Sequence, residues 1–290
     1  MCDIRQSGSY KSFMESLGWK VVHIYNKKNK TNNSVFIRTI PILGSFIKIL
    51  RIKPPIPYAK ISELAQKFRA FKIQIEADSV VLADTPDKNG YTYWGYKKTE
   101  NPLIPTKTIL IDLSKNQEKI FQSFSPEKRR AIRRAGKNKL EVKESADIEE
   151  FIFLKNSQLW PFGFLLSGEI KKLWKAFFFN GKAKLIIAKN KGEKIPQAGV
   201  LLLFHKNTSY YWLASATKSG KHLFAPALAV WEAVKLSKKM GYKFFDFEGI
   251  EDERFRNTRS WEGFSRFKLG FGGKIFIYTE PIQKSCLAGL

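Results

Sequence analysis

Cysteine and histidine are scarce in this chain, and their scarcity limits its possible chemistry. Cys2 and Cys286 stand at opposite ends, and the three histidines lie far apart in the sequence. These residues make neither a disulfide framework nor a zinc motif, which favours a reducing cytoplasm as the location. Neither cysteine has a histidine nearby and no G-x-S-x-G elbow occurs, so no covalent nucleophile is predicted.

Long hydrophobic runs are also missing. The most apolar N-terminal stretch, residues 36–52, is interrupted by Arg38, Pro41, Gly44, Lys48 and Arg51. A membrane-spanning helix needs about 20 consecutive apolar residues. We therefore expect no membrane span, and the opening of the chain does not resemble a signal peptide.

Acidic residues are outnumbered by basic ones. There are 26 Asp and Glu against 51 Lys and Arg, which gives a net charge of +25. This excess favours a polyanionic partner or an anionic membrane surface at the cytoplasmic face, although a solvated basic surface is the alternative. With 290 residues and 43% apolar content, the chain can fill one large or two modest cores.

The order of the predicted elements repeats. In the first part a helix over residues 9–18 precedes strand candidates and a second helix capped by Ser62; the strands are 19–26, 34–43, 45–52 and 72–77. In the second part strands precede a helix over 226–240, which Pro226 opens and Gly241 closes; the strands are 184–190, 198–205, 209–216 and 244–249. Strands, helix and strand in two copies predict a tandem α/β fold with a boundary near residue 104.

Two blocks near the C-terminus carry the most specific pattern. The first, FDFEGI, places Asp246 on one face of a predicted strand and Phe245 and Phe247 on the other. In the second, FSRFKLGFGG from Phe264, an extended chain puts Arg266 and Lys268 on one face and Phe267 on the other. The glycines that follow allow a backbone or ligand to approach closely.

These two blocks together resemble the C-terminal motifs of the Fem family of peptidoglycan bridge-forming aminoacyltransferases. The segments from Thr108 and from Pro196 resemble the family's basic helix and its central hairpin, long helix and strand, and the helix from Ser9 is similar to its first helix. In place of the family's T-x-x-R-x-x-F run, the stretch from Asn156 has no arginine.

The resemblance implies two GNAT-like (acyl-CoA N-acyltransferase-like) domains with central mixed, mostly antiparallel sheets. The expected domains are residues 1–104 and 105–280, with 281–290 as a candidate addition to the first. It implies transfer of an amino acid from aminoacyl-tRNA to an amine of a UDP-linked or lipid-linked peptidoglycan precursor. No cofactor is expected, and coenzyme A is disfavoured because Gly220 is the only glycine where acetyl-CoA enzymes carry a Q/R-x-x-G-x-G/A loop.

Acyl transfer to an amine requires alignment of the reactants, removal of a proton and stabilisation of an oxyanion. Lys268 is the candidate for meeting the negative charge, with Phe267 packed beside it, and a solvated lysine on an edge strand is the alternative. Asp246 can orient or deprotonate the amine, or serve a structural role.

Further residues are candidates for substrate binding. Lys218 and Lys221 precede a helix N-terminus, where backbone N–H groups attract phosphate. Tyr211 either lines a groove or packs in the core. The remaining candidates are Arg266, together with Lys11 and Arg38 as contacts for the acceptor, for which a plain surface role is the alternative.

A basic helix after Ser125 is the candidate site for tRNA. It carries two i, i+4 pairs, formed by Arg129, Arg130, Arg133 and Arg134. Such stripes can follow nucleic-acid phosphates, or simply face solvent. Two other functions stay open from the sequence: an acyl-CoA-dependent N-acyltransferase acting on a sugar or small amine, and a non-catalytic RNA-binding protein.

Overall fold

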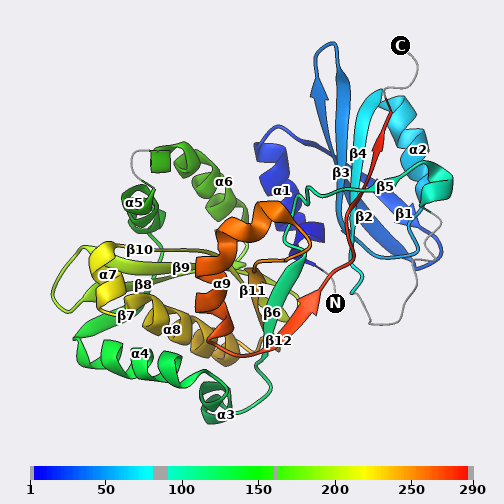
Figure 1. Cartoon of the computed structure of the whole chain (residues 1–290). Coiled ribbons are helices and arrows are strands. Elements are labelled where there is room, and N and C mark those ends of the chain that lie inside the picture. Colours follow the sequence, from blue (N-terminus) through cyan, green and yellow to red (C-terminus); the bar gives the residue numbers. More distant parts are fainter. Residues whose placement is uncertain (1–2, 81–90, 160–161, 287–290) are drawn as a thin grey trace. The chain divides into compact units, whose positions relative to one another are not determined.

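The computed structural model describes residues 3–80, 91–159 and 162–286. The chain divides into two compact units (Figure 1). The first comprises Met1–Lys107, Glu251–Ser260 and Phe276–Leu290, and the second comprises Thr108–Ile250 and Trp261–Ile275.

The first unit is built on a mixed sheet in the order β1-β2-β3-β4-β13-β5. Its strands are β1 (Lys20–Asn26), β2 (Thr31–Ile40), β3 (Gly44–Ile52), β4 (Ala70–Ala77), β5 (Lys97–Lys98) and β13 (Ile282–Ser285). Its helical segments are η1 (Ile4–Gln6), α1 (Gly8–Ser16), α2 (Tyr58–Lys67) and η2 (Thr92–Trp94). A further segment, η4 (Arg256–Trp261), lies almost entirely in the part of this unit formed by Glu251–Ser260. The first three predicted strands are confirmed as β1, β2 and β3, which form an antiparallel meander, and β3 pairs with β4 in parallel.

Helix α2 begins earlier than predicted. Ser62 was expected to cap it, but the helix begins at Tyr58, after Pro57, and no side chain caps it. The ring of Tyr58 stacks on Trp94 with a centroid distance of 6.0 Å. Tertiary packing of this first turn therefore determines where the helix begins, which local capping rules do not capture.

The second unit repeats the same order of elements around a sheet arranged β12-β6-β11-β10-β9-β8-β7. Its strands are β6 (Lys107–Asp112), β7 (Leu140–Ser145), β8 (Ala183–Asn190), β9 (Pro196–His205), β10 (Thr208–Ala216), β11 (Phe244–Gly249) and β12 (Lys274–Ile277). Its helical segments are α3 (Gln117–Gln122), α4 (Pro126–Lys137), α5 (Ile148–Gln158), η3 (Phe162–Leu166), α6 (Ser167–Phe178), α7 (Lys218–His222), α8 (Ala225–Lys239) and α9 (Glu262–Leu269).

Both units thus contain a three-stranded meander, a helix and a strand that returns in parallel to the third strand. In the first unit these are β1-β2-β3, α2 and β4; in the second they are β8-β9-β10, α8 and β11. All other pairs of strands whose register is described are antiparallel. The predicted tandem fold with mixed, mostly antiparallel sheets is confirmed.

Helices cover both faces of the second sheet. Figure 1 shows α4 and α8 on one side and α5 and α6 on the other. Strand β9 contacts both α5 and α8, which explains why nearly all of its residues are buried rather than alternating between core and solvent.

The predicted strand over Phe264 and the following residues is wrong, because most of this segment forms helix α9. Phe264, Phe267, Lys268 and Phe271 follow the spacing i, i+3, i+4, i+7, which is that of one helix face. Phe267 and Phe271 pack with ring centroids 5.2 Å apart. The aromatic content suggested a strand, but the helical period decides the structure.

The glycines after α9 allow the chain to pass close to other backbone segments. Gly272 and Gly273 have φ angles of +68° and +95°, which side chains rarely tolerate. A Cβ atom on Gly273 would lie 2.7 Å from the carbonyl oxygen of Leu110, and one on Gly272 would lie 2.5 Å from that of Ser123. At these positions the chain after α9 passes close to Leu110 of β6 and to Ser123, which follows α3.

We expect Gly273→Ala to destabilise the protein by about 3 kcal/mol, because it combines left-handed backbone with a steric clash. Gly136→Ala is the matched control, since a Cβ there, in helix α4, meets no atom within 4 Å. The control should be neutral or stabilising by up to about 1 kcal/mol. Urea denaturation of both variants measures this difference, and equal stabilities would contradict the role assigned to Gly273.

Candidate active site

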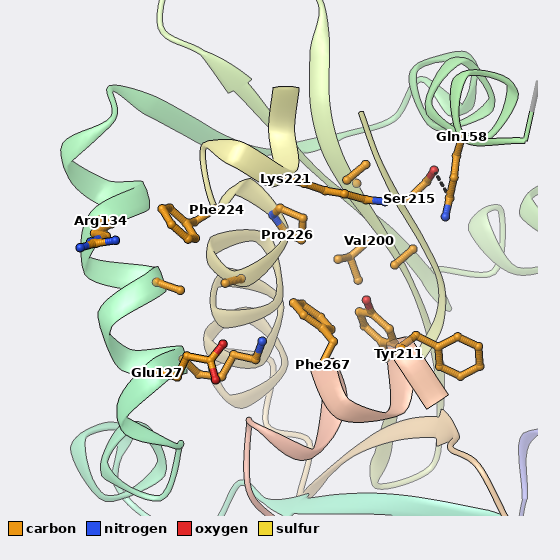
Figure 2. A pocket seen from close by; sticks show the side chains of 18 of the residues that line it. Glu127, Arg134, Gln158, Val200, Tyr211, Ser215, Lys221, Phe224, Pro226 and Phe267 are labelled. Atoms are coloured by element: carbon orange, nitrogen blue, oxygen red, sulfur yellow. Dashed lines mark hydrogen bonds between the residues drawn. The ribbon is translucent and has the colours of Figure 1, made fainter. Parts of the chain in front are cut away.

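The second unit contains a cavity of ≈ 630 Å³, lined by residues from α4, α8, α9 and the strands β9 and β10 (Figure 2). This volume lies within the range of small-molecule sites. Aromatic rings and basic side chains share its wall: Tyr211, Phe224, Phe264, Phe267, Lys128, Arg130, Arg134 and Lys221. The cavity can therefore accept a ligand with both flat and anionic parts.

The cavity lies where β10 extends beyond its parallel neighbour. The described pairing of β10 with β11 ends at Tyr210 and Asp246, whereas β10 continues to Ala216. A register shift in the pairing with β9 follows at once, between Tyr211 and Leu213. The structure thus places the Tyr211 side chain, one of the predicted binding residues, in the cavity wall.

Lys268 lies behind the aromatic part of this wall. Its ammonium donates to the carbonyl oxygen of Gly249 at 2.6 Å and lies 5.0 Å from the ring centroid of Phe264 and 5.5 Å from that of Tyr211. Only 8% of Lys268 is exposed. Burial lowers the pKa of Lys268 to about 8, while the carboxylates of Glu248 and Asp246 act in the opposite direction. This lysine can lose or gain a proton near physiological pH.

The predicted geometry around Lys268 is wrong, because this segment is a helix and not a strand. Arg266 and Lys268 were expected to share one face of a strand, but two residues on a helix point in different directions. Arg266 is exposed and pairs with Glu262 at 2.7 Å, while Lys268 is buried. Phe267, expected on the opposite face from Lys268, lines the cavity.

Asp246 stabilises the backbone that faces Lys268. Its carboxylate accepts hydrogen bonds from the Thr108 hydroxyl at 2.5 Å and from the backbone N–H of Glu248 at 2.7 Å. Glu248 has a φ of +58°, and the pairing with β6 shifts register between Asp246 and Gly249. This β-bulge turns the Gly249 carbonyl toward the ammonium. The contacts fit the structural alternative for Asp246.

Of the four arginines predicted to bind tRNA on α4, two line the cavity and two make other contacts. Arg130 and Arg134 line the cavity, whereas Arg129 donates to the carbonyl oxygen of Gln122 and Arg133 lies 5.6 Å from the ring centroid of Phe121. Ser125 caps the helix through the backbone N–H of Lys128, as predicted. A shallower hollow of ≈ 390 Å³ runs along the helix, lined by Pro126, Arg129, Arg130, Arg133, Arg134 and Lys137.

Sequence reasoning missed Lys128, which lines the larger cavity. Its ammonium is 4.3 Å from the ring centroid of Phe267, and burial lowers its pKa. A Cβ on Gly270 would lie 2.7 Å from Cε of Lys128, so the glycine makes room for the lysine stem. Residues 128 and 270 are distant in sequence, and no local pattern indicates that they meet.

The segment containing Lys218 and Lys221 was predicted as a loop but forms the short helix α7. The Thr217 hydroxyl caps this helix by accepting from the N–H of Gly220 at 2.9 Å. Lys221 reaches the cavity, as Figure 2 shows, whereas Lys218 is exposed and is not among the lining residues. The structure therefore brings one of these two lysines to the site.

A polar pair that sequence reasoning also missed lies in the cavity wall. The Ser215 hydroxyl lies 2.7 Å from Oε1 of Gln158 and 2.9 Å from the carbonyl oxygen of Leu154. Both Ser215 and Gln158 line the cavity (Figure 2). Serine and glutamine give no distinctive motif, so their meeting across β10 and α5 follows from the fold alone.

The two remaining candidates, Lys11 and Arg38, belong to the first unit. The ammonium of Lys11 lies 3.4 Å from Nε2 of His23, and Arg38 donates to the carbonyl oxygen of Leu17 at 2.6 Å. Arg38 also lies 5.3 Å from the ring centroid of Trp19. They are not lining residues of the cavity in the second unit.

Among the described residues, no group of three or more His, Cys, Asp or Glu side chains is arranged to hold a metal ion. No helix in the described parts of the chain has both the length and the apolar character needed to cross a membrane.

Comparison with known proteins relates this site to a family. The model of the FemAB family matches residues 180–279, which include β10, β11, α9 and therefore Lys268. The structure of FemX superposes with a TM-score of 0.78 at 16% identity, covering 97% of this chain and 92% of that one. The resemblance to the Fem family is confirmed. A search of curated proteins gave no match.

Two other similar structures share the Fem-like fold at lower similarity. One is the C-terminal domain of a putative lysylphosphatidylglycerol synthetase from Agrobacterium fabrum, with a TM-score of 0.59, 11% identity and coverage of 98% of this chain and 89% of that one. The other is a tandem GNAT protein from the clavulanic acid biosynthesis pathway, with a TM-score of 0.56, 8% identity and coverage of 89% and 80%. Together with FemX they define the fold as tandem GNAT-like.

We expect Thr108→Val to destabilise the protein by about 1–3 kcal/mol, because it leaves the buried Asp246 carboxylate without a hydroxyl donor. Thr92→Val is the control, since Thr92 is exposed in η2. Thermal denaturation compares the two variants. If Thr108→Val and the control have the same melting temperature, the Thr108–Asp246 contact does not stabilise the bulge.

Proposed function

We propose that the chain transfers an amino acid from aminoacyl-tRNA to an amine of a peptidoglycan precursor at the cytoplasmic face of the membrane. The family match and the tandem GNAT-like fold support a transferase of the Fem type. The observation that carries the proposal is the position of Lys268, a buried ammonium directly behind the aromatic wall of the cavity.

The reaction needs no covalent intermediate. The acceptor amine attacks the ester carbonyl, a tetrahedral oxyanion forms, and collapse breaks the ester bond and releases the tRNA hydroxyl. The amine loses one proton and the departing oxygen gains one, so the exchange balances without a cofactor. A cation beside the carbonyl stabilises the oxyanion more than the ground state, and this difference accelerates the reaction.

Lys268 suits this role because its environment is dry and its position is fixed. The bond to Gly249 uses one of its three N–H donors. The rings of Phe264 and Tyr211 both line the cavity within 5.5 Å of the ammonium, so displacement of a ring would bring the ammonium closer to a ligand there. The pKa near 8 keeps the lysine mainly charged at neutral pH.

The cavity fits the aminoacylated end of a tRNA. A nucleoside can stack on an aromatic ring such as that of Phe267, and phosphates can meet the basic side chains of α4 and α7. The hollow along α4 extends this positive surface with Arg129, Arg133 and Lys137. We assign Lys11 and Arg38 in the first unit to the acceptor, whose phosphates would suit their charge.

We expect Lys268→Ala to lower kcat by about 10²–10³-fold, the usual effect of removing one donor to an oxyanion. In the unaltered protein the rate should fall as pH rises above about 8, because Lys268 loses its proton there. That alkaline decline should be absent in Lys268→Ala. Initial rates with charged tRNA and a muramyl peptide acceptor, measured from pH 6 to pH 9.5, test this.

Lys119→Ala, on the exposed surface of α3, is the control and should retain full activity. Equal kcat values for Lys268→Ala and Lys119→Ala would exclude the proposed role of Lys268, whereas RNA binding without measurable transfer by the unaltered chain would indicate a protein that only binds RNA. Mass spectrometry of muropeptides from cells with and without the gene tests the same function in the cell, where an unchanged cross-bridge would contradict it.

We expect Arg130→Ala with Arg134→Ala to weaken tRNA binding and to reduce its salt dependence. Each lost phosphate contact should lower the slope of log K against log salt by about 0.7–0.9. Fluorescence anisotropy with a labelled acceptor-stem RNA at several salt concentrations measures the slope, and Lys119→Ala again serves as control. Binding of coenzyme A in calorimetry, without any response to RNA, would instead indicate an acyl-CoA-dependent enzyme.

A further inference from the structure

The turn between α5 and α6 exposes a cluster of large apolar side chains. Phe162, Phe164 and Leu165 are exposed by 67%, 62% and 65%, and two neighbours, Leu159 and Leu166, by 39% and 42%. We call these five residues the apolar turn. Single exposed apolar residues are common in soluble proteins, but several large ones close together in the chain indicate an interaction surface.

The backbone of the apolar turn is firmly packed. Gly163 is the one buried residue of η3, and a Cβ there would lie 2.6 Å from Cα of Asn156. The N–H of Phe162 donates to the carbonyl oxygen of Leu159 at 2.8 Å. Because η3 rests on α5 through a glycine, its four other side chains are directed outward. The exposure is a property of the fold and not of a frayed end.

The turn leads directly into a helix with a basic outer surface. Helix α6 buries Ile170, Leu173, Trp174 and Phe177 at the spacing of one face. Its lysines, Lys171, Lys172 and Lys175, are all exposed. Glu169 is the only acidic residue between 153 and 178, against four lysines. Apolar side chains and cations therefore stand side by side on a chain of net charge +25.

We infer that the apolar turn is a docking surface for an anionic lipid bilayer. Its rings and leucines enter the interface, and the lysines of α6 contact the headgroups. Burial of apolar area and attraction to anionic lipid combine in such surfaces. The exposed lysines of α6 next to the apolar turn complement an anionic surface. This inference deepens the membrane location in the proposed function, and vesicle binding tests it separately from the proposed chemistry.

The test measures binding of the full chain to vesicles of phosphatidylcholine with 30% phosphatidylglycerol by cosedimentation. We expect Phe164→Ser with Leu165→Ser to weaken binding at least about tenfold, because two side chains no longer enter the bilayer. Replacing Lys171, Lys172 and Lys175 by Gln should weaken it by about 10²-fold and remove most of its salt dependence. Vesicles of phosphatidylcholine alone should bind weakly.

The matched control is Ile42→Ser with Leu43→Ser, in the turn between β2 and β3. These two side chains are exposed by 101% and 60%, but they lie outside the apolar turn. The control should bind vesicles as the unaltered chain does, and all variants should keep the same melting temperature because the replaced residues are exposed. Absence of vesicle binding in the unaltered chain would overturn the inference, as would undiminished binding of the Phe164 and Leu165 variant or an equal loss in the control.

Discussion

The buried ammonium of Lys268 is the constraint on which the site depends. A charged group in a dry environment must find polar partners, and here the Gly249 carbonyl supplies one at 2.6 Å. That carbonyl is available because β11 leaves regular pairing after Asp246. The Asp246 carboxylate accepts a hydrogen bond from the backbone N–H of Glu248 in the bulge, and its negative charge favours the protonated lysine. The strand irregularity, the buried carboxylate and the lysine therefore form one unit, and none of them is explained without the others.

The same irregularity opens space next to the lysine. Pairing of β10 with β11 ends at Tyr210, so the next residue, Tyr211, pairs only with β9 and lines the cavity. Helix α9 then closes the opening with Phe264 and Phe267, and it also carries Lys268. A wall of rings between the lysine and the cavity keeps water from the ammonium, which preserves both its lowered pKa and its electrostatic strength.

The sequence predicted the parts of this arrangement that depend on local pattern. The meanders, the tandem order and helix α8 between Pro226 and Gly241 agree with the structure. The residues of α9 were assigned to a strand because phenylalanine favours strands, and only the i, i+3, i+4, i+7 spacing reveals the helix. Lys128 and the pair of Ser215 and Gln158 were missed, since each depends on contacts between segments far apart in the chain.

The basic side chains of the second unit lie in two different environments. Around the cavity, Lys128 and Arg134 lie over the rings of Phe267 and Phe224, and the partial burial of Lys128 strengthens its interaction with an anion. On α6 the lysines are exposed, although Lys171 also pairs with Glu149 at 2.8 Å, and only a large anionic surface can attract them appreciably at physiological salt. Exposed phenylalanines and leucines would promote self-association in a neutral protein, but mutual repulsion at +25 opposes it. The charge that permits the apolar turn to stay exposed is thus also the charge that would bring it to an anionic bilayer.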